Sequence, residues 1–193
     1  MTYIVCAFEA EARALIDSYR LIKHETRPFA VFGNDKIHLI ISGMGQAKAK
    51  EAAQYLLSRQ SIQKEDIFIN IGICAAQQSY KVGELLIVKS IHNEEISHLL
   101  STPTSPIKEV SCFSAETAQE QSTQTDIAEM EALGLYETLK ENFLPENMSF
   151  LKVVSDNFQP FIPKKKFIID LIQARLKEIK THIKTLQGDC LVR

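Results

Sequence analysis

The sequence lacks the cysteine and histidine spacings that a disulfide framework or a zinc site would need. Its cysteines, Cys6, Cys74, Cys112 and Cys190, lie far apart and form no CxxC pair, and its histidines are equally dispersed. Thiol and imidazole ligands of a structural metal normally recur at short spacing. We therefore expect reduced thiols in a reducing compartment and no metal.

Long apolar runs and a strong net charge are also missing. No stretch approaches the roughly 20 apolar residues of a membrane span, and the short N-terminal apolar run soon reaches Glu9 and Glu11, unlike a signal peptide. The net charge is −2 and the basic residues are scattered, so we expect no nucleic-acid partner. The run Lys164-Lys165-Lys166 indicates a solvated helix start more than a phosphate site. These features favour a cytoplasmic protein without a membrane partner.

The composition is that of one ordinary globular domain. Of the 193 residues, 45% are hydrophobic and 24% are charged. A single core stops growing only beyond roughly 250–300 residues. We therefore expect one domain over residues 1–193, with a core that needs no disulfide.

Short apolar runs alternate with segments of helical periodicity along the chain. Strands are predicted at residues 2–7, 29–32, 36–41, 66–73, 84–91, 108–113 and 149–155. Helices are predicted at residues 9–18, 46–59, 126–141 and from about 163 to 186, with Asp126 as an N-cap and Pro163 at a first helical position. Residues 93–108 and 114–125 are polar and indicate loops. The alternation predicts a single-domain, three-layer α/β fold with helices flanking a central mixed, largely parallel sheet.

Ligand sites in such folds form at the carboxyl ends of the strands. The predicted strand ends carry Glu9-Ala10-Glu11, Ser42-Gly43-Met44-Gly45, Cys74-Ala75-Ala76 and Ser155-Asp156-Asn157. The helix predicted from residue 126 adds Glu129, Met130 and Glu131. These are the places where we look for chemistry.

Each of these residues also has an ordinary structural interpretation. Glu9 and Glu11 could simply favour a helix dipole, and Asp156 could cap a turn. Gly43 and Gly45 suit a tight turn as well as an anion site. Local sequence therefore decides none of them alone.

Three carboxylates from distant elements could nevertheless meet at one edge of the sheet. They are Glu11, Glu131 and Asp156, although a surface role for Glu131 is equally open. Carboxylate pairs are the usual tools for cleaving glycosidic bonds, because one protonates the leaving group and the other activates water. Their combination favours that chemistry.

Six ordered blocks of the chain resemble the nucleoside phosphorylase superfamily, and most closely its 5′-methylthioadenosine/S-adenosylhomocysteine nucleosidase group. The blocks cover most of the chain. They are Ala7-Phe8-Glu9-Ala10-Glu11, Ser42-Gly43-Met44-Gly45-Gln46-Ala47-Lys48-Ala49, Asn70-Ile71-Gly72-Ile73-Cys74-Ala75-Ala76, Val82-Gly83-Glu84-Leu85, Glu129-Met130-Glu131-Ala132 and Val154-Ser155-Asp156.

The resemblance implies hydrolysis of the N-glycosidic bond of a purine nucleoside or thio-nucleoside. In it, Glu11 corresponds to the acid that activates the attacking water, and Asp156 to the acid that protonates the purine at N7. Ser155 helps to place that carboxyl. Met130 and Glu131 correspond to the pair that packs under the ribose and binds its hydroxyls.

The resemblance also implies further substrate contacts. Ser42 and Gly43 match the loop near the water or anion, and Phe113 the aromatic residue that stacks on the base. Lys152 stands where an arginine usually lies near the water, and it keeps the charge but not the bidentate geometry. Ala75 falls in a turn that is usually rich in glycine, so side chains there face the ligand.

The resemblance leaves alternatives to hydrolysis open. Phosphorylases normally carry an arginine in the block that here runs from Cys6 to Glu11, and this block has none, which favours water as the nucleophile. Two further alternatives are a homologue that binds a nucleoside without turnover and a structural relative whose site is closed. The resemblance further implies a homodimer and no cofactor. The chain is shorter than is usual for the family, and the deficit falls between Ile91 and Asp126.

Overall fold

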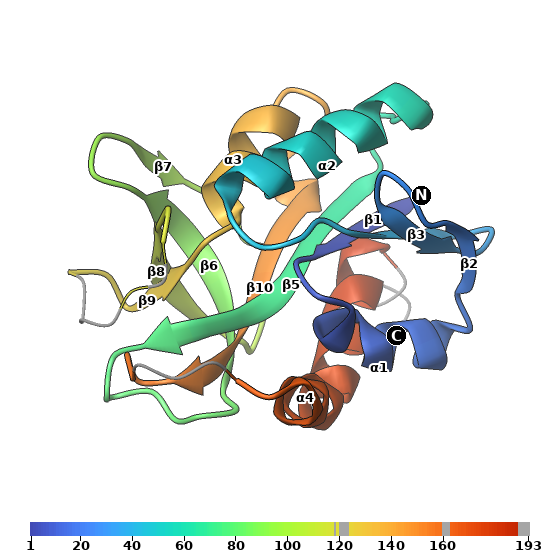
Figure 1. The fold of residues 1–193 in the computed structure, drawn as a ribbon. Coiled ribbons are helices and arrows are strands. Elements are labelled where there is room, and N and C mark those ends of the chain that lie inside the picture. Colours follow the sequence, from blue (N-terminus) through green and yellow to red (C-terminus); the bar gives the residue numbers. More distant parts are fainter. Residues whose placement is uncertain (118, 120–123, 160–162, 189–193) are drawn as a thin grey trace.

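The computed structural model describes residues 1–117, 119, 124–159 and 163–188. Within them lies one mixed sheet with helices on both faces (Figure 1). The free thiols of Cys6, Cys74 and Cys112 are buried, whereas Cys190 lies outside the described residues. Among the described helices, none has an apolar stretch that would cross a bilayer.

The strands are β1 (Thr2–Cys6), β2 (Ile22–Glu25), β3 (Ala30–Gly33), β4 (Ile37–Ile41), β5 (Ile67–Ala76), β6 (Leu85–His92), β7 (Ser97–Leu99), β8 (Lys108–Ser114), β9 (Ile127–Glu129) and β10 (Met148–Asp156). The helices are α1 (Glu9–Tyr19), α2 (Gln46–Arg59), α3 (Ala132–Leu139) and α4 (Lys165–Leu186), with a short 3-10 turn at Pro145–Asn147.

Strands β4, β1, β5 and β10 run parallel and form the centre of the sheet. Strands β2 and β3 extend one margin in antiparallel fashion. On the other side, β6 pairs with β10, and the pairings β6–β8, β8–β9 and β9–β5 return to the centre and close a ring. The predicted mixed α/β sheet is confirmed.

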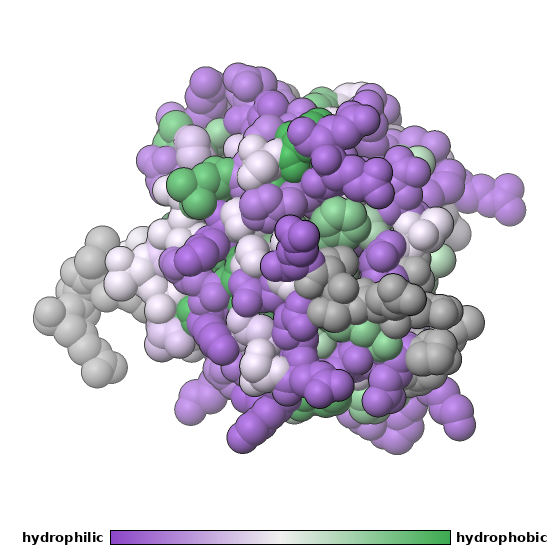
Figure 2. Space-filling model, turned by 90° about the vertical axis from the view of Figure 1, so that its left-hand side faces the viewer, coloured by the Kyte–Doolittle hydropathy of each residue, from purple (hydrophilic) through white to green (hydrophobic). Residues whose placement is uncertain are grey.

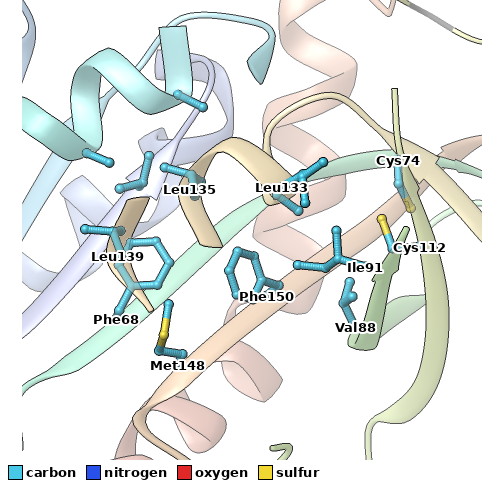
Figure 3. Close-up of a cluster of buried hydrophobic side chains, with 14 of the residues drawn as sticks. Phe68, Cys74, Val88, Ile91, Cys112, Leu133, Leu135, Leu139, Met148 and Phe150 are labelled. Atoms are coloured by element: carbon cyan, nitrogen blue, oxygen red, sulfur yellow. The ribbon is translucent and has the colours of Figure 1, made fainter. Parts of the chain in front are cut away.

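The two faces of the sheet are covered by different helix pairs. Because successive residues of a strand point to opposite faces, Phe68 and Phe150 pack toward α2 and α3, whereas Ile69 and Leu151 pack toward α1 and α4. Figure 3 shows Phe68 and Phe150 beneath the leucines of α3. The result is the predicted three-layer arrangement, and it leaves the carboxyl ends of the central strands at one edge.

The outer surface of the β6–β9 side is mainly hydrophilic. Figure 2 shows this side, with apolar residues in small scattered groups. Leu99 of β7 is among the exposed large apolar side chains, at 80% exposure. Isolated apolar residues are normal on protein surfaces.

The predicted helix at residues 126–141 is wrong at its start. Residues Ile127–Glu129 form β9 instead, and the helix begins only at Ala132. Asp126 is not an N-cap, because its carboxylate accepts hydrogen bonds from Ser111 and from the Tyr80 hydroxyl. The Glu129 carboxylate takes the capping role by accepting the N–H groups of residues 131 and 132.

Other expectations differ from the structure more modestly. Residues Cys74-Ala75-Ala76 continue β5 rather than forming a turn, because β9 and β10 pair with them. Helix α4 begins at Lys165, two residues after Pro163. Strands β2 and β7 were not predicted. The bounds of α2 and the β3–β4 hairpin are confirmed.

Candidate active site

A cavity of about 500 Å³ opens at the carboxyl ends of the central strands. Its wall is built from the residues that follow β1, from the ends of β5, β9 and β10, and from the start of α4. Concave sites of this size are the usual places for small ligands. The acidic residues that line it are Glu9, Glu11, Glu129, Glu131 and Asp156.

Glu11 is held at the floor of the cavity by backbone donors from two elements. The Phe8 N–H donates to Glu11 Oε2 over 2.9 Å, and the Ile73 N–H donates to Oε1 over 2.9 Å. Burial raises the pKa of the Glu11 carboxyl, although these hydrogen bonds and the charge of Lys152 oppose the shift. The outcome is a fixed carboxyl that is more basic than an exposed one.

Gly72 makes room for this carboxyl. A Cβ atom at Gly72 would lie 3.0 Å from Glu11 Oε1 and 3.6 Å from Lys152 Nζ. Glycine at this point of β5 therefore lets the two charged groups lie side by side over the strand.

Glu131 is fixed by a close contact between two helices. A Cβ atom at Gly134 of α3 would lie only 2.6 Å from the backbone oxygen of Gln46 in α2. That approach brings Glu131 Oε1 within 2.9 Å of the Gly45 N–H, which donates to it. Burial and the negative charge of Glu129 raise the pKa of the Glu131 carboxyl to about 7.

Glu129 and Lys152 form a buried ion pair beneath the acids. Lys152 Nζ lies 2.7 Å from Glu129 Oε2, and the two side chains are almost fully buried. Burial opposes ionisation of both groups, but Lys152 lowers the pKa of Glu129, and Glu129 and Glu131 raise the pKa of Lys152. The pair stays ionised because each charged group stabilises the other in place of the water that burial excludes.

Asp156 is the last residue of β10 and lines the cavity. The Ser155 hydroxyl donates to Asp156 Oδ2 over 2.7 Å, and the Gln159 N–H donates to Oδ1 over 3.2 Å. Ser155 Oγ also lies 3.0 Å from the backbone oxygen of Cys74. Asp156 is half-buried, so its carboxyl can reach a ligand.

The structure brings some of the predicted site residues to the cavity and leaves others away from it. Those that line the cavity are Glu11, Ala75, Met130, Glu131, Ser155 and Asp156. Lys152, Ser42, Gly43 and Phe113 are not among the described residues that line it.

These four residues have other contacts. Lys152 is covered by its pair with Glu129. The Ser42 hydroxyl donates to the Gly43 carbonyl over 2.8 Å, and Gly43 has a φ of 82°. Phe113 pairs with Ala128 across β8 and β9. The ligand contacts that the resemblance gives to them stay predictions.

Sequence reasoning missed several groups that the structure places in the wall. Glu129 was predicted only as a helix residue, although it stands two residues before Glu131 and lines the same cavity. Ala115 lines the cavity two residues beyond Phe113, and Phe8, Gln159 and Lys165 line it as well. Only the run of three lysines was visible beforehand as a signal for Lys165.

A metal has no evident place in the described part of the chain. No group of three or more His, Cys, Asp or Glu side chains there could hold one. The carboxylates at the cavity instead find their partners in backbone N–H groups and Lys152.

Comparison with known proteins gives likenesses of structure only. No protein-family model matches the sequence, and no curated protein matches it. Among solved structures, an Arabidopsis thaliana 5′-methylthioadenosine nucleosidase has a TM-score of 0.77 at 16% identity, with 97% of this chain and 96% of that chain covered. The Helicobacter pylori futalosine hydrolase has a TM-score of 0.77 at 12% identity, with 95% and 97% covered.

A Campylobacter jejuni 5′-methylthioadenosine/S-adenosylhomocysteine nucleosidase is similar over the same extent. Its TM-score is 0.75 at 12% identity, and the alignment covers 95% of this chain and 98% of that chain. The chain thus has the fold of these nucleosidases, in agreement with the resemblance seen in the sequence.

Proposed function

We propose that this protein hydrolyses the N-glycosidic bond of a purine nucleoside or thio-nucleoside. The observation that carries the proposal is the convergence of Glu11, Glu131 and Asp156 on one cavity. Glycosidic cleavage needs one group that protonates the leaving base and another that activates water. Asp156 at the end of β10 and Glu11 in α1 line the same cavity of about 500 Å³.

The charge of the cavity floor supports the same reaction. Three carboxyl groups, those of Glu11, Glu129 and Glu131, lie near Lys152, which is the one buried lysine or arginine among the described residues. Stretching of a glycosidic bond develops positive charge on the ribose. Fixed negative groups around that position stabilise the transition state more than the neutral ground state.

In the proposed reaction, each bond change has a residue beside it. The bond from C1′ to the base breaks with its electron pair going to the purine, which takes a proton from Asp156 at N7. A water oxygen forms the new bond to C1′, and Glu11 accepts a proton from that water. Glu131 binds the ribose hydroxyls, and Met130 packs against the sugar.

Phosphorolysis has less support than hydrolysis. The described lining of the cavity contains no arginine, and bidentate arginine is the usual clamp for phosphate. Lys152, which holds the nearest buried positive charge, is already paired with Glu129. Water is therefore the proposed nucleophile.

The test is a panel of purine nucleosides and 5′-thio-nucleosides incubated with the protein in phosphate-free buffer. Release of free base together with reducing sugar supports hydrolysis, and a need for phosphate or arsenate overturns it. Ligand-induced thermal stabilisation without product identifies a binding protein instead.

We also propose, from the resemblance alone, that the protein works as a cytoplasmic homodimer without a cofactor. Light scattering at the concentration of the assay tests the oligomeric state. A monomer that is fully active contradicts the dimer.

A further inference from the structure

The side chain that follows Asp156 is tied to three backbone carbonyl groups, and the proposed reaction gives it no role. Asn157 Nδ2 lies 3.1 Å from the backbone oxygen of Ala76, 3.0 Å from that of Gln77 and 3.2 Å from that of Tyr80. These acceptors belong to the last residue of β5 and to the loop that follows it. Asn157 is not among the described residues that line the cavity. It therefore binds to the frame of the site and not to the space for a ligand.

The backbone on both sides of Asp156 departs from regular strand geometry. Between Val154 and Asp156 the pairing with β5 shifts, so that two steps along β10 match one step along β5. Such irregularities change the direction in which a side chain points. Phe158 has a φ of 57°, which is unusual for a bulky residue, and the turn there leads back toward Asp156. Regular sheet pairing alone therefore does not decide where the Asp156 carboxyl points.

The hydrogen bonds of the Asp156 carboxyl are local to its own segment. The Gln159 N–H donates to Oδ1 over 3.2 Å, and the Ser155 hydroxyl lies 2.7 Å from Oδ2. The same hydroxyl lies 3.0 Å from the backbone oxygen of Cys74, but it has one hydrogen and can donate fully to only one of these acceptors. A link from this segment to the rest of the site is still needed, and the amide of Asn157 supplies one.

The loop that accepts these hydrogen bonds is itself cross-linked to other strands. The Gln77 N–H donates to the backbone oxygen of Asp126 over 2.9 Å, and the Tyr80 hydroxyl donates to Asp126 Oδ1 over 2.8 Å. Ser111 of β8 donates to the other oxygen of the same carboxylate through its N–H and its hydroxyl. Asn157 thus attaches its segment to a part of the molecule that is fixed from several sides.

We propose that Asn157 is a positioning residue: its amide holds residues 155–159 so that the Asp156 carboxyl meets the leaving base. The proposal rests on the proposed function, in which Asp156 is the acid. An amide suits this place because it has two hydrogens for the carbonyl groups and no charge. Alanine would leave these carbonyl oxygens without the donor, and aspartate would place carboxylate oxygens against them.

A double-mutant cycle tests whether Asn157 acts through Asp156. The rates of purine release are compared for the unmodified protein, Asn157→Ala, Asp156→Asn and the variant with both changes. Asn157→Ala alone lowers kcat by about tenfold and leaves KM within about twofold, because a displaced acid affects the bond change more than binding. In the Asp156→Asn background the same change costs less than about twofold, since the acid that it positions is already absent. Equal losses of kcat in the two backgrounds overturn the proposal, because they are the result of a purely structural role.

Asn147→Ala is the matched control. Asn147 is also half-buried, and its Nδ2 donates to the backbone oxygen of Glu65 over 3.0 Å, with neither residue among the described lining of the cavity. This variant keeps kcat within about twofold, and a tenfold loss in it would overturn the proposal by showing that any such amide matters equally. If Asn157→Ala does not fold, Asn157→Ser, which keeps one hydroxyl donor, replaces it in the cycle.

Crystal structures separate this proposal from the proposed function. If the unmodified protein releases no purine, hydrolysis is refuted, and the structures of the unmodified protein and of Asn157→Ala decide the positioning role. A displaced segment 155–159, with the contact between Gln159 and Asp156 lost, supports it. A segment that superposes within coordinate error overturns it.

Discussion

Strand β10 carries two buried pairs of polar side chains with opposite electrostatic outcomes. Lys152 lies 2.7 Å from the Glu129 carboxylate, and its pKa is raised. Ser149 Oγ lies 2.8 Å from His182 Nε2 on α4, and burial lowers the pKa of His182 to about 4. Burial penalises the charged form of both bases, but only Lys152 has acids beside it.

The positions of the two pairs explain why they differ. Residues 149 and 152 point to opposite faces of the strand, because their spacing is odd. Ser149 and His182 are enclosed between β10 and α4, whereas Glu129 of the other pair lines the cavity. Ionised groups are retained where a ligand is proposed to bind, and the enclosed pair is neutral.

Glu11→Gln is expected to have the largest effect on the cavity side of this comparison. The amide cannot accept a proton from water, so kcat falls by about a hundred- to ten-thousandfold. Steady-state kinetics on the best nucleoside of the panel measures it. Asp17→Asn, on the exposed part of the same helix, is the control and keeps full activity. Activity within threefold of the unmodified protein in Glu11→Gln would remove Glu11 from the mechanism.

Glu129→Gln tests the buried ion pair itself. Removing one partner leaves Lys152 charged and buried, so the free energy of unfolding falls by about 3–5 kcal/mol. Urea denaturation measures the change. Asp170→Asn breaks the exposed pair with Lys166 and costs less than about 1 kcal/mol. Equal losses in the two variants would mean that the buried pair contributes no more than an exposed one.

His182 is expected to make stability fall as the pH is lowered. Above pH 6.5 the side chain is neutral in the folded and the unfolded chain. As the pH falls from 6.5 toward 4, the unfolded chain takes up a proton that the folded chain does not, which removes about 3 kcal/mol. Below pH 4 both states are protonated and the loss levels off.

His182→Gln isolates this contribution from the carboxylates that titrate in the same range. The variant loses less stability between pH 6.5 and 4 than the unmodified protein does, as followed by urea denaturation at several pH values. Identical pH slopes would show that His182 titrates normally in the fold.

Gly72→Ala is expected to have the smallest effect of the substitutions on the cavity side. The new methyl group meets Glu11 Oε1 at 3.0 Å and must displace it by a few tenths of an ångström. We expect kcat to fall by about tenfold, since small shifts of a catalytic group lower rates steeply. Kinetics together with the melting temperature separate a shifted carboxyl from a misfolded protein. An unchanged kcat means that the position of the carboxyl is not critical.

The parts of the fold that were predicted correctly depend on signals carried by neighbouring residues in the sequence. The bounds of α2 follow from its Ala-rich helical periodicity, and the β3–β4 hairpin from the turn at Asn34 and Asp35. The prediction of the start of α3 was wrong because Glu129, which caps this helix, lies in β9. Strand β9 pairs with β5 and β8. That pairing depends on residues far away in the chain.

The same limit applies to the site. The positions of Glu11, Glu131 and Asp156 on one cavity agree with the expectation from the strand ends and the resemblance. The pair of Glu129 with Lys152 and the place of Lys165 in the cavity wall were not predicted, because each depends on how β10 and α4 are placed in space. Phe113 was assigned to the base from its approximate position in the resemblance, outside the six blocks, whereas Ala115 lines the cavity.

The most direct test of the central claim is release of free purine in phosphate-free buffer by the unmodified protein and by Asp156→Asn. The account predicts release by the unmodified protein and a rate at least about a hundredfold lower in the variant, because the amide cannot protonate the leaving base. Full activity of Asp156→Asn, or no purine released from any nucleoside of the panel, would contradict it.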